Sequence, residues 1–591
     1  MGRPVRNIAG TRVKVCLAQI NTTPGDFEGN LQRIRTGVDA ATAGGAHLVV
    51  FPELTIPGYL TQDLIYHPAY VARNLAVLDE VKAMTIDTPC AVVVGFIDHN
   101  PGPGKPFRNC AAVFRGGDEV ARYSKHLLPF YDVFDELRYF EPGTELAVID
   151  VAGERVGIVI CEDLWNDKGS DGYDYAANPM QRYRDQGVDC VVSLNSSPYS
   201  TDKPVDRIRR IAPTSVGGPD VVYCNQRGGQ DELVFDGGSF VLRGGDLLHL
   251  SGTVDEDSFD IVDLTQEPAV QDVAAKSTEI RKRSCSLLDL LVLGLKDYVV
   301  KSGFRELVLA SSGGVDSAVV AALASRAVGP DHVHAVRLPS IYSSDHSRSD
   351  AIALHRNLGC YDYAIGVDHQ PLVSMLNTHF HAHPGDAQNL VTQVFAEDRY
   401  GGVADENIQA RIRDLYVMHF SNAFGAMPLS TGNKTESACG YYTHFDMNFS
   451  FAPIKDLYKR QVVDIARQIP EIPDNIWLKP PSAELAEGQT DEASLLPYSV
   501  LDPIVESYVE HYISSFNVFV EWTAGRRDEI SQDPDRLARW LGEPSSATEY
   551  QRIISLIGRM EYKRRQTCPG TKVSKVAFGI GRRIPIVEKW L

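Results

Sequence analysis

The chain lacks the features that mark a nucleic-acid-binding or zinc-binding protein. Its 591 residues include 58 Lys and Arg against 77 Asp and Glu, which gives a net charge of −19. Such a charge repels a polyphosphate backbone, because affinity for DNA or RNA comes largely from basic side chains. The ten cysteines include no C-x-x-C pair, so neither a zinc motif nor a redox motif is indicated. We therefore expect no nucleic-acid partner.

Long hydrophobic runs are also missing. Residues 1–20 lack the apolar core of about 7–15 residues that a signal peptide needs, and no later segment approaches the ~18 apolar residues of a membrane span. We expect a cytoplasmic protein with free thiols and no membrane partner. The hydrophobic share of 43% and the charged share of 23% are those of a soluble globular protein. Because 591 residues exceed what one core organises, two domains are expected.

The first half of the chain alternates short apolar runs with polar, helix-like stretches. The apolar runs are rich in valine and isoleucine and too short for helices, so they predict buried strands: Val13–Ile20, His47–Phe51, Cys90–Ile97, Val156–Ile160, Val188–Leu194, Val221–Cys224 and Phe240–Leu242. This alternation indicates a layered α/β domain. We place it at residues 1–270, followed by a polar linker at 271–285.

The second half opens with an amphipathic run, Leu287–Val300, that ends at Gly303, where a glycine commonly follows a helix. A predicted strand, Leu307–Ala310, comes next, then a glycine-bearing turn and a small-residue helix, Ala318–Ala327. Strand, turn and helix form the opening unit of a parallel sheet whose ligands bind at the carboxyl ends of the strands. We therefore predict a second, doubly wound α/β domain over 286–591, with a C-terminal extension.

Three reactive side chains each follow an apolar strand in the first domain: Glu53, Lys125 and Cys161. A thiol with the ordinary pKa of ~8.5 is mostly protonated at neutral pH, so a catalytic cysteine needs a base or a cation nearby. Amide hydrolysis also develops an oxyanion that an ammonium group stabilises. Taken alone, Cys161 would be a small buried hydrophobe, Lys125 a surface charge and Glu53 a helix cap. Together they form a minimal catalytic set.

The local sequence around these residues resembles the nitrilase superfamily over about residues 12–265. The resemblance is carried by Phe51-Pro52-Glu53-Leu54, Ser124-Lys125-His126-Leu127-Leu128-Pro129, Phe134–Phe140 and Ile160-Cys161-Glu162-Asp163-Leu164-Trp165. It implies an α-β-β-α sandwich with Glu53 as general base, Cys161 as nucleophile, Lys125 as oxyanion-stabilising cation, Glu136 as a supporting acid and the Glu162 N–H in the oxyanion hole.

The branch of that family that hydrolyses glutamine resembles this chain in two further places. Tyr131 lies six residues after Lys125, and Asn195-Ser196-Ser197-Pro198 runs on to Lys203. The resemblance implies that Tyr131, Ser197 and Lys203 bind glutamine. A cation suits the α-carboxylate, and a hydroxyl or aromatic group suits the amine end. The alternative for Lys203 is a loop lysine in water.

A phosphate-binding loop is predicted where the strand Leu307–Ala310 meets its helix. Two glycines in Ser311-Ser312-Gly313-Gly314-Val315-Asp316-Ser317 let backbone N–H groups approach an anion, and the helix N-terminus adds partial positive charge. Asp316 would repel phosphate unless it holds Mg²⁺. The loop has no G-x-x-x-x-G-K-[ST] lysine, which argues against a kinase or motor.

This loop resembles the PP-loop of N-type ATP pyrophosphatases, in which ATP is cleaved between its α and β phosphates. The resemblance implies ATP binding by Ala310, Ser311, Ser312, Gly313, Gly314, Val315, Asp316 and Ser317, with Thr431. Later segments resemble NAD synthetases over about residues 286–585: Arg337–Ser340, Glu406–Arg413, Thr431-Gly432-Asn433-Lys434-Thr435-Glu436, Pro481–Leu485 with Gln489–Glu492, and Glu561–Gln566.

The NAD synthetase resemblance implies a substrate and a reaction. Asn407, Glu436 and Lys563 would contact deamido-NAD⁺, and Asp316 and Glu436 would share Mg²⁺. Glutamine, ATP and deamido-NAD⁺ are the implied small-molecule substrates, and ammonia released at Cys161 would amidate an adenylylated carboxylate. We expect a homo-oligomer.

One segment departs from the family pattern. The chain reads Gly440-Tyr441-Tyr442-Thr443-His444-Phe445-Asp446-Met447-Asn448 before Phe451-Ala452-Pro453-Ile454, without the usual glycines and one residue shorter, which predicts less backbone freedom. Two other functions are left open. One is a carbon–nitrogen hydrolase with a nucleotide-sensing domain, and the other is a different PP-loop amide ligase.

Overall fold

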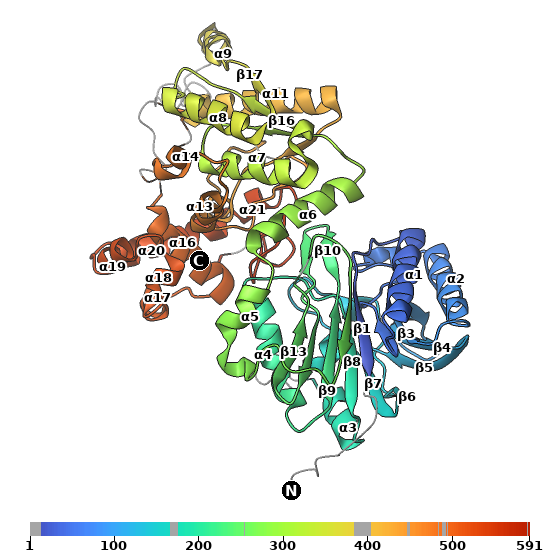
Figure 1. Ribbon diagram of the computed structural model, residues 1–591. Helices are drawn as coiled ribbons and strands as arrows, with labels where there is room; N and C mark the ends of the chain where they lie inside the picture. Colours follow the sequence, from blue (N-terminus) through green and yellow to red (C-terminus); the bar gives the residue numbers. More distant parts are fainter. Residues whose placement is uncertain are drawn as a thin grey trace. The chain divides into compact units, whose positions relative to one another are not determined.

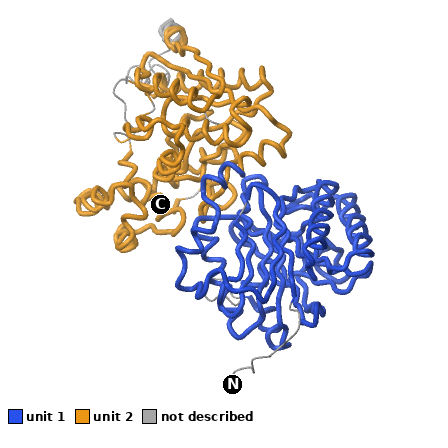
Figure 2. Tube along the Cα trace, in the orientation of Figure 1, with its two compact units in different colours: residues 1–293 blue, residues 294–591 orange. Residues whose placement is uncertain are grey.

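The computed structural model describes residues 13–590 apart from 166–174, 253, 383–402, 446–448, 483, 487–491, 493–494 and 588. The chain divides into two compact units, residues 1–293 and 294–591 (Figure 2). The described helices are all too short or too polar to cross a membrane.

Two six-stranded sheets form the centre of unit 1 (Figure 1). The strand order of the first is β14 (Ser258–Asp263), β1 (Lys14–Gln19), β2 (Leu48–Val50), β3 (Ala91–His99), β4 (Phe107–Arg115) and β5 (Asp118–Ser124). The order of the second is β13 (Asp246–Leu250), β12 (Phe240–Arg243), β9 (Asp220–Asn225), β8 (Cys190–Asn195), β7 (Glu154–Ile160) and β6 (Val148–Val151). A hairpin of β10 (Arg227–Gln230) and β11 (Leu233–Asp236) stands apart.

Helices cover the outer face of each sheet. α1 (Phe27–Ala43) and α2 (Pro68–Met84) pack on the first sheet, and α3 (Pro179–Asp185) and α4 (Lys203–Ser215) pack on the second. A third apolar layer lies between the sheets and joins residues such as Val15, Val50 and Val192. Each fully buried side chain of this kind contributes about 1.5–3 kcal/mol. The predicted α-β-β-α sandwich is confirmed.

The predicted strands are those with both faces buried. β1 is almost wholly inaccessible, as expected for strands packed between a helix layer and a second sheet, which read as continuous apolar runs. Lys125 was expected to follow an apolar strand, but the strand before it, β5, has mostly exposed or intermediate residues and was missed. Its partner β4 was missed as well, and the two pair antiparallel around Gly116 and Gly117.

Unit 2 contains a parallel four-stranded sheet in the order β17 (Tyr361–Ala364), β16 (Val333–Arg337), β15 (Leu307–Ala310) and β18 (Met427–Leu429). After β15 the chain adds β16 and β17 on one side of it, and β18 is then added on its other side. The carboxyl ends of β15 and β18 therefore form the topological switch point, where ligands bind in such sheets. The sheet helices include α7 (Val315–Val328), α8 (Asp345–Leu358), α9 (Gln370–Ala382), α11 (Val403–Phe424) and α13 (Lys459–Gln468). The predicted doubly wound domain is confirmed.

A separate helical core follows the sheet. It joins α16 (Tyr498–His511), α17 (Phe516–Thr523), α19 (Pro534–Leu541) and α20 (Ser546–Arg559) through buried residues such as Leu501, Phe519 and Ile553. The remaining helices are α5 (Ser277–Arg283), α6 (Leu287–Lys301), α12 (Lys434–Cys439), α14 (Asp474–Leu478), α18 (Arg527–Ile530) and α21 (Glu561–Arg564).

Candidate active sites

The predicted catalytic residues of unit 1 come from four different segments. Glu53 follows β2, Lys125 follows β5, and Cys161 follows β7 at the start of the short helix Cys161–Leu164. Glu136 begins the short helix Glu136–Arg138. All four are at most 5% exposed. Cys161 has φ +44°, a strained conformation for a residue with a side chain. Such strain is typical of functional positions.

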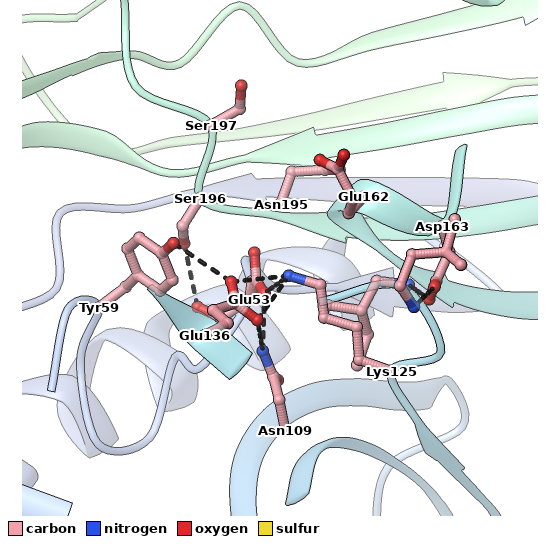
Figure 3. Close-up of polar contacts among 12 residues, drawn as sticks. Glu53, Tyr59, Asn109, Lys125, Glu136, Glu162, Asp163, Asn195, Ser196 and Ser197 are labelled. Carbon is pink, nitrogen blue, oxygen red and sulfur yellow. Dashed lines mark hydrogen bonds and ion pairs between the residues drawn. The ribbon is translucent and has the colours of Figure 1, made fainter. Parts of the chain in front are cut away.

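Lys125 joins the two carboxylates (Figure 3). Its Nζ donates to Glu53 Oε1 at 2.6 Å and to Glu136 Oε1 and Oε2 at 2.8 and 2.9 Å. The charges of Glu53 and Lys125 both act on the Cys161 thiol. The structure therefore brings together the base, cation, nucleophile and supporting acid that the sequence predicted.

Asn109 is a further member of the cluster that the sequence analysis missed. It lies on β4, and its Nδ2 donates to Glu53 Oε1 at 2.7 Å and to Glu136 Oε2 at 3.4 Å (Figure 3). Glu53 Oε2 is buried and has no hydrogen-bond partner among the described residues. One carboxylate oxygen of Glu53 is thus held by two donors, and the other is left to accept a proton.

Burial decides the charge state of the site at rest. Burial raises the pKa of Cys161 well above its usual value, and Glu53 raises it further against the opposing effect of Lys125. Burial also raises the pKa of Glu136 to about 7. For Lys125, burial alone would lower the pKa, but Glu136 and Glu53 raise it well above the usual value. The resting site therefore holds a neutral thiol beside a charged ammonium.

Asp163 is a second missed residue. It is fully buried, and burial raises its pKa to about 6. Its Oδ1 accepts the backbone N–H groups of His126 and Leu127, and its Oδ2 accepts the Tyr123 hydroxyl and the Ile160 N–H. This carboxylate ties the segment after Lys125 to the segment that carries Cys161.

The predicted glutamine-binding residues lie in two places around this cluster. The Tyr131 hydroxyl donates to both oxygens of Glu162 at 3.0 Å, and Tyr175 donates to Glu162 Oε1 at 3.0 Å. Lys203 begins α4 with its Nζ 5.9 Å from the centre of the Phe134 ring. The Ser197 N–H donates to Asn225 Oδ1 at 2.9 Å. The Glu162 side chain is buried beside Tyr131, and the sequence analysis assigned only its backbone N–H.

Unit 2 contains a cavity of about 560 Å³ at the switch point of its sheet. Its lining includes the predicted residues Ala310, Ser311, Ser312, Gly314, Val315, Asp316, Asn407, Glu436 and Lys563. Gly313 and Ser317 are not among the lining residues, but both contribute to the conformation of the loop. Gly313 has φ +79°, and a Cβ there would lie 2.2 Å from the Ser347 carbonyl oxygen, while Ser317 Oγ accepts the Ser312 N–H at 3.3 Å. Thr431 lies in the loop between β18 and α12.

Lys459, which the sequence analysis missed, stands between the two predicted metal ligands. Its Nζ bonds to Asp316 Oδ2 and lies 3.4 Å from Glu436 Oε1. Asn433 Nδ2 also donates to Asp316 Oδ1 at 2.9 Å. Two carboxylates facing a phosphate loop fit Mg²⁺, which commonly takes one or two carboxylates and completes its shell with waters and phosphates.

Lys563 and Asn407 hold the segment that departs from the family pattern. Lys563 Nζ donates to the Gly440 carbonyl oxygen at 2.7 Å and also to that of Tyr442, and it lies 4.5 Å from the Tyr442 ring centre. Asn407 Oδ1 accepts the Thr443 hydroxyl at 2.5 Å. The segment is therefore fixed to the cavity wall as far as Thr443. Residues 446–448, and Ala483 and 489–491 of the later motif, lie outside the described residues.

Comparisons with known proteins identify the family to which each half of the chain is similar. The carbon–nitrogen hydrolase family matches residues 14–170, and the NAD synthase family matches residues 287–527. The glutamine-dependent NAD(+) synthetase of Thermotoga maritima is 35% identical over 98% of this chain and 99% of its own length. That of Synechocystis sp. is 36% identical over 97% and 98%. The solved structure of the Acinetobacter baumannii glutamine-dependent NAD+ synthetase with ADP is 30% identical, with a TM-score of 0.67 over 98% of this chain and 99% of that one.

The fold and the two sites define a two-domain enzyme in which a carbon–nitrogen hydrolase domain is fused to an NAD synthase domain. Identity and coverage narrow this class further. The chain belongs to the glutamine-dependent NAD(+) synthetase family.

Proposed function

We propose that the chain hydrolyses glutamine at Cys161 and uses the released ammonia to convert deamido-NAD⁺ to NAD⁺ with the cleavage of ATP to AMP and pyrophosphate. The observation that carries the proposal is the presence of two complete constellations in one chain. Lys125 is bonded to Glu53 and Glu136 in unit 1, and the phosphate loop of unit 2 lines a cavity with Asp316 and Glu436.

The glutaminase half needs a proton acceptor, a nucleophile and an oxyanion site. Glu53 Oε2, which has no hydrogen-bond partner among the described residues, accepts the thiol proton as Cys161 Sγ attacks the glutamine amide carbon. The Lys125 ammonium and the Glu162 N–H stabilise the oxyanion. Glu53 then protonates the leaving ammonia and activates the water that hydrolyses the thioester. Because the thiol is neutral at rest, proton transfer accompanies attack.

Glutamine recognition is assigned to Tyr131, Ser197 and Lys203, and we add Glu162. Glu162 is a buried carboxylate that accepts hydrogen bonds from the hydroxyl groups of Tyr131 and Tyr175. Such a carboxylate suits the α-ammonium of an amino acid. Lys203 carries the charge that suits its α-carboxylate. Charge-assisted hydrogen bonds of this kind are roughly twice as strong as neutral ones. The two charges of the substrate backbone are thus matched by opposite charges.

The synthetase half positions reactants and neutralises charge. The nicotinate carboxylate of deamido-NAD⁺ attacks the α-phosphorus of ATP, pyrophosphate leaves, and ammonia displaces AMP to give the carboxamide. Residues 310–317 and Thr431 are assigned to ATP, and Asn407, Glu436 and Lys563 to deamido-NAD⁺. Positioning contributes much of the rate in phosphorus-centred transfers of this kind.

Asp316 and Glu436 are the residues that would hold Mg²⁺ in this cavity. The ion supplies positive charge to the phosphates when bound. Lys459 bonds to Asp316 and lies near Glu436, so its ammonium group would lie close to phosphates held at this loop. The ammonium group then adds to the neutralisation of the triphosphate.

The proposal is tested by mixing the protein with ATP, Mg²⁺, deamido-NAD⁺ and either glutamine or ammonia, and by assaying NAD⁺, AMP and pyrophosphate. We expect synthesis from both nitrogen sources. Glutamine hydrolysis without any NAD⁺ formation would instead support a hydrolase with a nucleotide-sensing domain. Domain limits of 1–270 and 286–591, a homo-oligomeric state and a cytoplasmic location stay predictions from the sequence.

A further inference from the structure

A chain of polar side chains leads from the wall of the ATP cavity to the phosphate loop. Arg337, at the end of β16, donates Nε and Nη2 to the two oxygens of Asp362 at 2.7 and 3.0 Å. Asp362 Oδ1 also lies 2.9 Å from His355 Nδ1, and His355 Nε2 lies 2.8 Å from Ser311 Oγ. Arg337 and Ser311 both line the cavity, while His355 is 1% exposed. Ser311 belongs to the loop assigned to ATP, but none of the proposed catalytic steps gives a role to Arg337, Asp362 or His355.

The partners of His355 fix its tautomer. An ionised carboxylate has no proton to donate, so His355 Nδ1 carries the hydrogen that bonds to Asp362. Partial burial opposes ionisation of Asp362, but hydrogen bonds from Arg337 and His355 hold its pKa below the usual value. Burial likewise keeps the pKa of His355 below the usual value, although Asp362 opposes this effect. The imidazole is therefore uncharged at neutral pH, and its Nε2 carries a lone pair that accepts a hydrogen bond.

A lone pair on Nε2 decides the direction of the Ser311 hydroxyl. Ser311 must donate its hydrogen to His355, so only its oxygen lone pairs remain for a ligand in the cavity. An oxygen in this state repels a phosphate oxygen but accepts a hydrogen bond from an amino or hydroxyl group. Within ATP, such donors belong to the base and the ribose.

We propose that Ser311 is a nucleoside-binding residue of the ATP cavity, and that His355 and Asp362 are positioning residues that hold its hydroxyl as a hydrogen-bond acceptor. This inference rests on the proposed function of the cavity. It also assigns Arg337 to the relay, since its guanidinium donates two hydrogen bonds to Asp362.

The charged groups around His355 come from each element packed against α8. Asp362 belongs to β17 and Arg337 to β16. The charged residues of α7 are Asp316, which pairs with Lys459, and Arg326, which pairs with Glu471. Asp474 begins α14, and Lys479, directly after α14, pairs with Asp350 of α8. Only Asp362 and Arg337 among the described residues are found to act on the imidazole.

Protonation of His355 reverses the Ser311 hydrogen bond. The imidazolium carries hydrogens on both nitrogens, so Nε2–H donates to Ser311 Oγ and the hydroxyl hydrogen turns to the cavity. One lone pair of Ser311 Oγ is then taken by Nε2–H and its own hydrogen faces the cavity, so its bond to the nucleoside donor is weakened. ATP binding should therefore weaken as the pH falls through the His355 pKa, which lies below that of an ordinary histidine.

The test uses ammonia-driven synthesis by the full chain, which bypasses Cys161. Ser311→Ala and His355→Phe should each raise the KM for ATP about three- to tenfold, the range for one neutral hydrogen bond, with kcat nearly unchanged. The double variant should show no further rise, because both changes remove the same bond. Ser325→Ala is the matched control, since Ser325 Oγ donates to the Ala321 carbonyl oxygen within α7. Independent effects that multiply in the double variant would overturn the proposal.

The pH dependence separates a positioning role from a purely structural one. The KM for ATP of the unaltered protein should rise as the pH is lowered from about 8 to about 5. This rise should be absent from Ser311→Ala. His355→Gln offers an amide oxygen as acceptor and should restore the KM without the pH dependence. Identical pH profiles for the unaltered protein and Ser311→Ala would contradict the proposal. Calorimetric titration measures ATP binding directly and allows the same comparison of variants without any reaction. If the unaltered protein bound ATP but formed no NAD⁺, the proposed function would fail while the inference about Ser311 could still be tested.

Discussion

Glu53 and Lys125 share a hydrogen bond of 2.6 Å that engages only one of the two carboxylate oxygens of Glu53. Asn109 donates to the same oxygen at 2.7 Å. Both donors together orient the carboxylate, and the opposite oxygen, Oε2, has no partner among the described residues. This asymmetry gives the base one fixed oxygen and one reactive oxygen. The Lys125 ammonium is also paired with Glu136, so it lies between two carboxylates.

Glu53→Gln should lower the rate of glutamine hydrolysis but raise the reactivity of the Cys161 thiol towards an alkylating reagent. Loss of the base should lower glutamine hydrolysis about 10²- to 10⁴-fold. The thiol pKa should fall, because Glu53 raises the pKa of Cys161 while Lys125 lowers it. A lower thiol pKa means more thiolate at neutral pH, so alkylation of Cys161 by iodoacetamide should become faster. In the unaltered protein, alkylation should keep rising with pH above the range of an ordinary cysteine.

Peptide mass spectrometry after timed alkylation measures both pH profiles at Cys161. The control is Glu256→Gln, an exposed glutamate in the same unit, which should match the unaltered protein in both assays. Slower alkylation in Glu53→Gln at neutral pH would show that Glu53 activates the resting thiol, contrary to the electrostatics of the site.

Cys161→Ala should remove glutamine-driven synthesis and spare ammonia-driven synthesis. The substitution takes away one sulfur from a buried position of unit 1, and the described residues that line the unit 2 cavity all come from residue 310 onward. NAD⁺ formation from each nitrogen source is the measurement, with Cys190→Ala, on the neighbouring strand β8, as the control for burial alone. Simultaneous loss of both activities in Cys161→Ala would refute the assignment of two independent sites.

Asp316→Asn should abolish synthesis from either nitrogen source while glutamine hydrolysis continues. The amide keeps the size of the side chain but loses the charge that a magnesium ion needs, and it removes the ion pair between Asp316 and Lys459. Glutamate release and NAD⁺ formation are followed in the same samples over a range of Mg²⁺ concentrations. Unchanged magnesium dependence would remove Asp316 from the metal site. Asp331→Asn, in the short helix Pro330–His332 that follows α7, is the matched control.

Sequence patterns predicted the parts of both sites that follow buried strands. Glu53 and Cys161 come directly after apolar runs, and the loop 311–317 follows one as well, so their place at strand ends could be anticipated. Asn109 could not, because it lies within β4, a strand with a mixed polar pattern. Lys459 was missed for a similar reason. It starts an amphipathic helix, where a lysine ordinarily faces solvent, and only tertiary packing turns it towards Asp316.

The relay from Arg337 to Ser311 lay beyond sequence reasoning as well. Its residues come from β16, β17, α8 and the loop after β15, and each has an ordinary explanation in its own segment. A histidine on a helix next to the sheet is more often a packed core residue than part of a site. The pairing of His355 with Asp362 and Ser311 depends on the register between neighbouring parallel strands and on the position of α8, which no local pattern specifies.

Lys434→Met should destabilise unit 2 more than any loss of a surface ion pair. Lys434 is fully buried, and its Nζ lies 2.8 Å from Glu510 and 3.0 Å from Asp456. Burial alone would lower the pKa of Lys434, but Asp456 and Glu510 raise it, so the lysine is charged in the fold. Its removal leaves buried carboxylates without a cation, and such a loss typically costs about 3–5 kcal/mol.

The comparison variant is Lys14→Met, because the Lys14–Asp263 pair is 3.9 Å apart and partly exposed. Exposed pairs contribute about 0–1 kcal/mol, so thermal unfolding of Lys14→Met should follow that of the unaltered protein. Hydrogen exchange resolves the two units separately and should show faster exchange in α12 and α16 of Lys434→Met, with protection in unit 1 retained. Equal exchange in both variants would contradict the prediction, because it would mean that the buried pairs of Lys434 contribute no more than the exposed pair of Lys14.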